Sequence, residues 1–267
     1  MEQILVKTYP REIAAFEVPK QDERIIGVHA IFGHEANLEQ VVKQLSDNSV
    51  WIKHADINEH AETKNLIINA FLDISKSRDG GQGFRDSLKN LDHVEKLVIS
   101  DKKQVLHQTS LFPIVNRQDR IIFQSTRRLQ YVRDQLERIL TPSGLSVIYY
   151  NMGFEGGRGM HQLFSEEFNS GMMDTGKRLE LLRDHSISGG MGIYDFTDLN
   201  LKTHSGIVKL YEDYECENVA KNNPVCHSAR GTLGGFLSLE WPDKKLKVLE
   251  LKCRAIGDPH CEFAVGE

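Results

Sequence analysis

All four cysteines of the chain lie close together near its C-terminal end, between Cys216 and Cys261. Such clustering in a chain of 267 residues indicates a shared role for the four thiols. Two of them, Cys253 and Cys261, flank the turn sequence Gly257-Asp258-Pro259, and runs of alternating apolar residues lie on both sides of that turn. This pattern predicts a β-hairpin. With Gly257 at the centre of the reversal, the two sulfur atoms would lie side by side.

The predicted hairpin register is consistent on both faces of the ribbon. Apolar residues would oppose apolar residues on the face of the cysteines. Opposite charges would meet on the other face, which stabilises an antiparallel pair of strands. The expected pairs are Leu249 with Val265, Leu251 with Phe263, and Lys252 with Glu262.

Three of the cysteines could supply most of a tetrahedral zinc site. Cys226 precedes a helix-like run and could bring a third sulfur atom to the pair on the hairpin. Three thiolates with one further oxygen or nitrogen or sulfur donor form a common structural zinc site. The candidates for the fourth donor are Glu250, Cys216, His227 and His260.

Regular strand geometry disfavours one of these donors, Glu250. Residues three apart on a strand, such as Glu250 and Cys253, point to opposite faces. A β-bulge near Leu251 would be needed to turn the carboxylate inward. Two other interpretations stay open: a disulfide between Cys253 and Cys261, or cysteines that are buried simply as small apolar side chains.

With these residues, the segment from about 145 to 265 resembles a 4-vinyl reductase domain, a small-molecule-binding module of archaeal and bacterial regulators. It is also similar to the sensor region of aromatic-responsive bacterial activators, in which three cysteines and a glutamate hold a zinc ion. That similarity implies a structural Zn²⁺ bound by Cys226, Glu250, Cys253 and Cys261. The resemblance is carried by Cys226, Gly231, Gly234, Gly235, Glu250, Cys253, Gly257, Asp258, Cys261 and Phe263.

The same resemblance implies that helices spanning 153–183 and 226–239 pack on an antiparallel sheet and enclose an apolar cavity. A mostly apolar wall with a few polar groups suits a small aromatic compound, a hydrocarbon or an acyl chain. His161 is the expected polar contact to that ligand. The candidate lining residues are Tyr149, Phe154, His161, Phe164, Phe168, Met172, Phe196 and Trp241.

The N-terminal part of the chain has the element order of a ferredoxin-like domain. Strands are predicted at 25–32, 50–57, 66–74 and 94–99, and helices at 37–45 and 84–91. This βαββαβ order resembles an ACT-type regulatory domain. The segment Gly33–Asn37 lacks the Asp-x-Pro-Gly turn usual in ACT domains that bind amino acids, so packing or dimerisation is the alternative role. A sheet face or edge of such a domain commonly pairs with its copy, and we therefore expect a homodimer.

A linker over 102–116 and a long helix over 119–140 are predicted to follow, with a stop at Thr141–Gly144. An apolar stripe runs along one side of this helix, and Arg127, Arg128, Arg133 and Arg138 form a solvated basic face on the other. The predicted fold is therefore α+β: an ACT-like domain (1–101), a linker and connecting helix (102–144), and a C-terminal α+β domain with an antiparallel sheet (145–267).

Glycines over 153–159 precede a predicted helix at Met160–Phe168. Their spacing is reminiscent of a dinucleotide-binding loop, but no βαβ unit with a suitably placed acidic residue follows. We expect these glycines to permit close packing between helices.

Composition narrows the possible functions. The net charge of −5 gives no overall attraction to nucleic acid or to an anionic membrane, and no segment has the layout of a signal peptide or membrane span. We expect a cytoplasmic sensor of a small apolar or aromatic ligand that controls transcription through a partner protein. The alternatives are an enzyme or accessory factor of the reductase or tetrapyrrole type, and a scaffold subunit.

Overall fold

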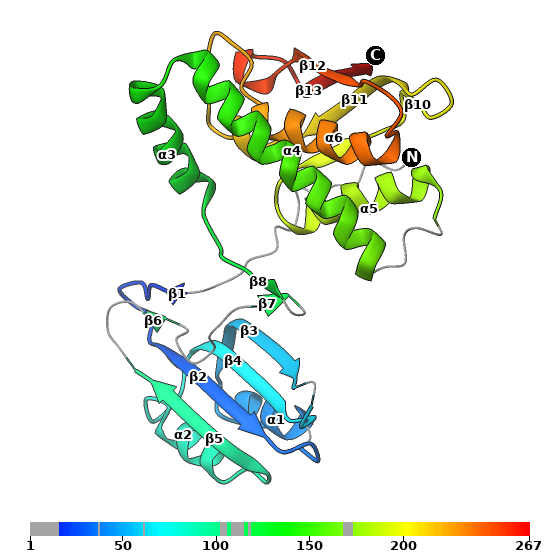
Figure 1. The fold of residues 1–267 in the computed structure, drawn as a ribbon. Helices are drawn as coiled ribbons and strands as arrows, with labels where there is room; N and C mark the ends of the chain where they lie inside the picture. Colours follow the sequence, from blue (N-terminus) through cyan, green and yellow to red (C-terminus); the bar gives the residue numbers. More distant parts are fainter. Residues whose placement is uncertain are drawn as a thin grey trace. The chain divides into compact units, whose positions relative to one another are not determined.

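The computed structural model describes residues 16–36, 38–60, 62–101, 106–107, 115–116, 119–167 and 173–267. The chain forms two compact units, Met1–Ile122 and Phe123–Glu267, named here the N-terminal and the C-terminal unit (Figure 1). Both combine helices with antiparallel sheets, which confirms the predicted α+β class. Among the described residues, no helix has the length and apolarity needed to cross a membrane.

The N-terminal unit is built around a four-stranded antiparallel sheet in the order β3-β4-β2-β5. Its elements are β2 (Ile25–Phe32), α1 (Leu38–Asp47), β3 (Trp51–Glu59), β4 (Leu66–Asp73), α2 (Gln82–Lys89) and β5 (Val94–Ser100). Short strands precede or follow it: β1 (Phe16–Glu17), β6 (Leu106–His107), β7 (Val115–Asn116) and β8 (Asp119–Arg120). This order and topology confirm the predicted ferredoxin-like arrangement.

Helices α1 and α2 share one face of this sheet. Leu45 of α1 and Phe84 and Leu88 of α2 are buried in one cluster with Ile26 and Val28 of β2. Since side chains alternate between the two faces of a strand, Ile26 and Val28 point to the same side. The alternation of the sequence was therefore sufficient to predict this core.

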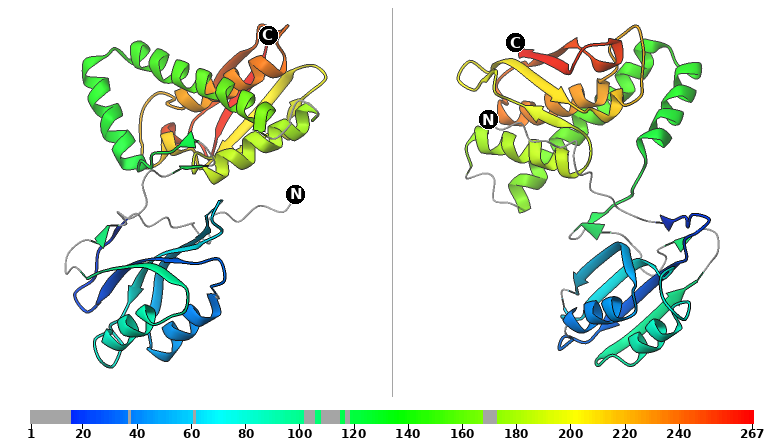
Figure 2. Two further views of the ribbon diagram at one scale, coloured as in Figure 1. Left: turned by 60° about the horizontal axis from the view of Figure 1, so that its bottom comes forward. Right: turned by 180° about the vertical axis from the view of Figure 1, so that it is seen from behind.

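The C-terminal unit has a five-stranded antiparallel sheet, in which β10-β11-β13-β12 are neighbours and β9 also pairs with β11. Helix α6 packs on the sheet and α4 packs on α6 (Figure 2). The elements are α3 (Thr126–Ile139), α4 (Pro142–Glu167), α5 (Thr175–Ser188), β9 (Ile193–Asp195), β10 (Leu199–Asn200), β11 (Ser205–Tyr211), the 3₁₀ turn η2 (Tyr214–Cys216), α6 (His227–Glu240), β12 (Lys247–Lys252), the 3₁₀ turn η3 (Arg254–Ile256) and β13 (Cys261–Gly266).

The helix boundaries differ from the prediction around Pro142. The sequence predicted a helix over 119–140 that stops at Thr141–Gly144, and a new helix from Met160. Instead α3 begins at Thr126, and Pro142 is the first residue of α4, which continues through the glycines to Glu167. Proline is favoured in the first turn of a helix, and the Thr141 hydroxyl accepts the N–H of Gly144 at 3.1 Å. The predicted stop signal is thus a start signal.

Glycines let α4 and α6 approach until their backbones touch. A Cβ atom added to Gly153 would lie 2.0 Å from the carbonyl oxygen of Ser228, and one added to Gly157 would lie 2.1 Å from that of Thr232. Gly235 of α6 is equally close to α4, with 1.9 Å to the Phe154 carbonyl oxygen. This contact confirms the predicted packing role of the glycine run.

Candidate metal centre and adjoining cavity

The cysteine-bearing hairpin forms as predicted between β12 and β13. Gly257 ends η3 with a φ of 102°, a left-handed conformation that favours glycine. The Asp258 carboxylate accepts the N–H of Cys253 at 2.8 Å and fixes the turn. Lys252 pairs with Glu262, as predicted, and its ammonium lies 2.9 Å from the carboxylate.

The predicted apolar pairs of this hairpin are wrong. Leu249 and Leu251 do not oppose Val265 and Phe263, and they are 55% and 53% exposed. Phe263 pairs with Glu250 instead, because the register shifts directly after Glu250. The irregularity falls at Leu251, where a bulge was required to turn Glu250 inward.

Four buried sulfur atoms converge beneath the hairpin. Cys216 ends η2, Cys226 is the N-cap of α6, and Cys253 and Cys261 lie on either side of the hairpin turn. All four Sγ atoms lie within 4.8 Å of one another. The Sγ of Cys216 is 3.1, 3.5 and 3.6 Å from those of Cys226, Cys253 and Cys261, and Cys226 is 3.5 and 3.2 Å from Cys253 and Cys261.

These separations fit a metal centre better than a disulfide. A zinc ion with four sulfur ligands at about 2.3 Å places its ligands about 3.8 Å apart. A disulfide would need about 2.05 Å, and all four thiols are free. The thiol of Cys216 also raises the pKa of Cys226, so this group of thiols opposes ionisation unless a cation neutralises it.

Glu250 lies beside the sulfur cluster but outside the group of four. Both of its carboxylate oxygens are buried and have no hydrogen-bond partner among the described residues. Burial raises its pKa to about 8, while the thiol of Cys226 acts in the opposite direction. The carboxylate is therefore close enough to interact with Cys226 and lacks the partners that a buried acid normally has.

A second buried acid, Glu215, fastens the cluster to α6. Its carboxylate accepts the backbone N–H groups of Ser228 at 3.2 Å and Ala229 at 2.8 Å, in the first turn of the helix. Arg133 of α3 donates to the carbonyl oxygens of Glu215 and Val225, at 3.2 and 3.3 Å. Arg133 is 6% exposed, so the prediction that it lies on a solvated basic face is wrong.

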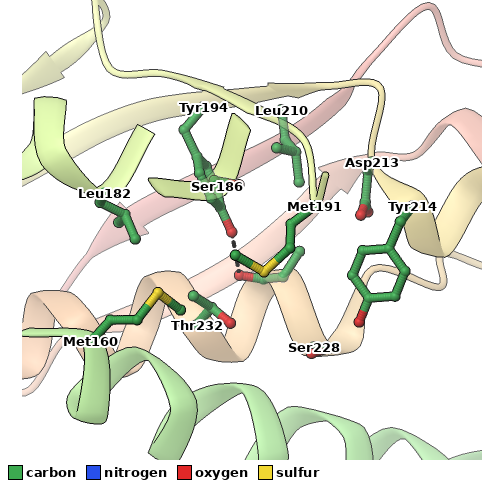
Figure 3. A pocket seen from close by; sticks show the side chains of 11 residues that line it. Met160, Leu182, Ser186, Met191, Tyr194, Leu210, Asp213, Tyr214, Ser228 and Thr232 are labelled. Carbon is green, nitrogen blue, oxygen red and sulfur yellow. Dashed lines mark hydrogen bonds between the residues drawn. The ribbon is translucent and has the colours of Figure 1, made fainter. Parts of the chain in front are cut away.

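An apolar cavity of about 40 Å³ adjoins the metal centre (Figure 3). One of its lining residues, Ser186, is 1% exposed, and its hydroxyl has no hydrogen-bond partner among the described residues. The Tyr194 hydroxyl, by contrast, donates to the Ala229 carbonyl at 3.2 Å. The lining residues are Met160, Leu182, Ser186, Met191, Tyr194, Leu210, Asp213, Tyr214, Ser228, Ala229 and Thr232.

The cavity and the metal centre share two backbone segments. Tyr214 lines the cavity and Cys216 belongs to the sulfur cluster, and both lie on η2. The carboxylate of Asp213, also in the cavity wall, is 4.0 Å from the Sγ of Cys216. On α6, Ala229 lines the cavity one turn after Cys226. A ligand in the cavity and a metal on the sulfurs would therefore act on the same segments.

The predicted ligand-binding set lies elsewhere in the C-terminal unit. His161 donates through Nε2 to the carboxylate of Glu240 at 2.9 Å, and Arg178 donates to the same carboxylate. None of the predicted residues within the described ranges lines the cavity at Ser186. The rings of Phe154, Phe164, Phe196 and Trp241 pack on Tyr150, Phe236, Tyr194 and His204, Tyr149 is half-buried, and Phe168 and Met172 lie outside the described residues.

Sequence reasoning missed Ser186, Asp213 and Tyr214 as lining residues. Ser186 lies inside a helix without any special spacing, so only the tertiary structure identifies it. Asp213 and Tyr214 closely precede Cys216, and that proximity was the available signal.

Comparisons with known proteins agree with the position of the cysteine cluster. One curated relative is an uncharacterised protein of Methanocaldococcus jannaschii, which is 28% identical over 92 residues, or 30% of this chain. The matched part spans 40% of that relative, less than half of its length.

Two solved structures are similar to parts of the chain. The phenol-responsive sensory domain of the transcription activator PoxR, bound to phenol, has a TM-score of 0.48 and 22% identity, over 55% of this chain and 76% of that chain. A vinyl-4-reductase family protein of M. jannaschii has a TM-score of 0.37 and 21% identity, over 57% and 85%. Scores of this size denote only a partial overlap of folds. The family model of the 4-vinyl reductase domain matches residues 207–267, and this stretch with its four cysteines is thereby identified as 4-vinyl reductase domain sequence.

Proposed function

We propose that the C-terminal unit is a sensor module whose cavity at Ser186 binds a small apolar or aromatic molecule with one polar group. The observation that carries the proposal is the buried, unpartnered hydroxyl of Ser186 in a mostly apolar wall. A buried hydroxyl without a partner costs free energy, and a ligand hydroxyl would supply the missing hydrogen bond. Apolar walls around such a polar point are typical of small-molecule sites.

Binding requires the cavity to enlarge. Its volume of about 40 Å³ holds little more than one water molecule, so a water at Ser186 is the competing occupant. Met160 and Met191 lie in the wall, and flexible methionine side chains can repack around a guest. A ligand that binds the enlarged state more tightly would shift the population towards it, and this is how occupancy would become a signal.

Phenol and toluene are suitable probes because they differ by a single hydroxyl for methyl exchange. We expect isothermal titration calorimetry to detect phenol binding, and Ser186→Ala to abolish the preference for phenol over toluene. Ser188→Ala is the matched control, since the Ser188 hydroxyl on the same helix is exposed and bonds the His185 carbonyl. Lack of binding by both probes and by longer hydrocarbons would contradict the sensor function.

We infer that the cysteine cluster holds one structural Zn²⁺ through Cys226, Cys253 and Cys261, with Cys216 or Glu250 as the fourth ligand. Soft thiolates at tetrahedral spacing suit zinc. Four protein ligands leave no open coordination position, which favours a structural over a catalytic role. Mass-spectrometric metal analysis of the purified chain should give about one zinc per chain. A folded, metal-free preparation would contradict this assignment. Four free thiols also suit a reducing compartment such as the cytoplasm.

We further propose that the chain forms a homodimer through the edge strand β3. This strand exposes Trp51, Ile52 and Ile57, whereas the opposite edge strand β5 exposes Val98. Native mass spectrometry should find a dimer that Ile57→Lys converts to monomer, while Val98→Lys leaves it intact. A monomeric wild-type chain would exclude the dimer.

The output of the sensor is proposed to be transcription control through a partner protein. The net charge of −5 disfavours direct binding to DNA. Affinity capture with and without bound phenol should therefore recover a partner in a phenol-dependent manner. Tight DNA binding by the isolated chain in a gel-shift assay would contradict a role that depends on a partner.

A further inference from the structure

Five donor groups surround a site that needs four. The sulfur atoms of Cys216, Cys226, Cys253 and Cys261 form the compact group, and the buried carboxylate of Glu250 stands beside it with both oxygens unpartnered among the described residues. The register shift after Glu250 is what turns this strand residue towards the cysteines. An orphaned acid at this place is costly unless it has a second function.

Cys216 differs from the other three cysteines in how it is held. Cys226 begins a helix and its carbonyl accepts the N–H of Arg230 at 3.0 Å, while Cys253 and Cys261 belong to the paired hairpin. Cys216 ends the three-residue turn η2 and is followed by exposed residues. It is 5% exposed, against 0% for each of the other three. Cys216 is therefore the ligand that can leave with the least disturbance.

We propose that Cys216 and Glu250 are interchangeable fourth ligands of the metal held by Cys226, Cys253 and Cys261. The inference rests on the metal site proposed above. In the exchange, the bond from the metal to the sulfur of Cys216 breaks and a bond to a carboxylate oxygen of Glu250 forms. Both donors are singly charged anions, so the charge of the coordinated centre does not change, and the released thiolate takes a proton from solvent.

The exchange would connect the metal centre to the cavity. Release of Cys216 frees η2, which carries Tyr214 of the cavity wall, and loosens the position of Asp213 next to it. With Cys216 bound, the wall is held in place. With Glu250 bound, the wall is free to move and the cavity can enlarge. The choice of ligand thus regulates access to the same cavity.

Zinc analysis and zinc X-ray absorption spectra of four variants test the proposal. Wild-type protein and Glu250→Gln should contain one zinc with four sulfur ligands. Cys216→Ser should keep its zinc with three sulfur ligands and one oxygen ligand. The double variant Cys216→Ser/Glu250→Gln should bind zinc more than about 100-fold more weakly, because both fourth ligands are gone. Cys261→Ser is the control that removes a fixed ligand and should lose zinc with Glu250 intact.

Two results would overturn the exchange. One is loss of zinc from Cys216→Ser as complete as from Cys261→Ser. The other is full zinc retention by the double variant, because water would then be the fourth ligand. A metal-free wild-type protein would instead refute the proposed metal site itself, so the two failures are distinguishable.

A measurement on the intact chain avoids the risk that a variant fails to fold. Iodoacetamide should alkylate Cys216 before the other cysteines, and native mass spectrometry should find the singly alkylated chain with zinc still bound. In Glu250→Gln the same alkylation should release the metal. Equal loss of zinc on alkylation in both proteins would contradict the exchange.

Discussion

The guanidinium of Arg178 donates through both Nε and Nη2 to the fully buried carboxylate of Glu240, with 2.8 Å between Nη2 and Oε2. His161 adds a third hydrogen bond to the same carboxylate. The cluster joins α4, α5 and the last turn of α6. His161 was predicted as a ligand contact, and its position here assigns it to the framework that holds the three helices together.

The Glu240 cluster predicts a loss of stability in acid. Despite its burial, the hydrogen bonds from His161 and Arg178 lower the pKa of Glu240 to about 2, below its ordinary value of 4.5. A depressed carboxyl pKa contributes stability that is complete above 4.5 and disappears as pH falls towards 2. Urea denaturation between pH 5 and 2 should thus show a steeper loss for wild type than for Glu240→Gln. Parallel pH profiles for the two proteins would contradict this.

At neutral pH, Glu240→Gln should destabilise the C-terminal unit by about 1–3 kcal/mol, because a buried charged pair loses one partner. Glu155→Gln serves as control, since Glu155 pairs with Arg158 at the surface of α4 at 3.9 Å. Exposed pairs contribute less than about 1 kcal/mol. Equal effects of the two substitutions would refute a special role for Glu240.

Glycine packing between α4 and α6 predicts a sharp contrast between neighbouring glycines. Gly157→Ala should destabilise by more than about 2 kcal/mol, because its methyl group would meet the Thr232 backbone. Gly156→Ala and Gly159→Ala should be neutral or stabilise by up to about 1 kcal/mol, because no atom lies within 4 Å of their added Cβ. Chemical denaturation followed by circular dichroism measures all three, and a destabilised Gly156→Ala would argue against the contact.

Removal of the metal should destabilise the C-terminal unit alone. Without a cation the four buried thiols take up protons and the link between η2, α6 and the hairpin weakens. Treatment with a zinc chelator should lower the melting temperature of that unit and speed hydrogen exchange in β12 and β13. The N-terminal sheet should be unaffected, and added zinc should restore the original transition. Unchanged exchange in the hairpin would contradict a structural metal.

Arg133 predicts a different outcome from its neighbours on α3. Arg133→Ala should cost about 2–4 kcal/mol, since the carbonyl oxygens of Glu215 and Val225 lose their buried donor. Arg128→Ala is the matched control on the exposed side of the helix and should change stability by less than about 0.5 kcal/mol. Hydrogen exchange should accelerate along α3 only in the Arg133 variant. If both variants behave alike, α3 does not depend on Arg133.

Local patterns predicted the elements whose residues specify them directly. The alternation in β2 and β4 and the Gly257 turn required no distant partner, and the structure has them as expected. The signal at Thr141-Pro142 was ambiguous, because proline suits both the residue after one helix and the first turn of the next. The bulge at Leu251 likewise depends on the backbone of β13 and on the cysteines, which sequence spacing alone does not encode.

Long-range contacts account for what the sequence left undecided. The burial of Arg133 depends on two carbonyl groups more than eighty residues away, and no pattern on α3 distinguishes it from Arg128. Similarly, Ser186 lines a cavity only because α5 is placed against η2 and α6. The cysteines were an exception, since their chemistry and clustering pointed to one site before the fold was known.

Helix α6 starts at the sulfur cluster with Cys226 and finishes at Glu240, where side chains from α4 and α5 converge. Between these ends its glycines seat it directly on α4, so no intervening side chains can absorb a displacement. The helix should consequently behave as a stiff rod, and tension applied at one of its ends would be felt at the other.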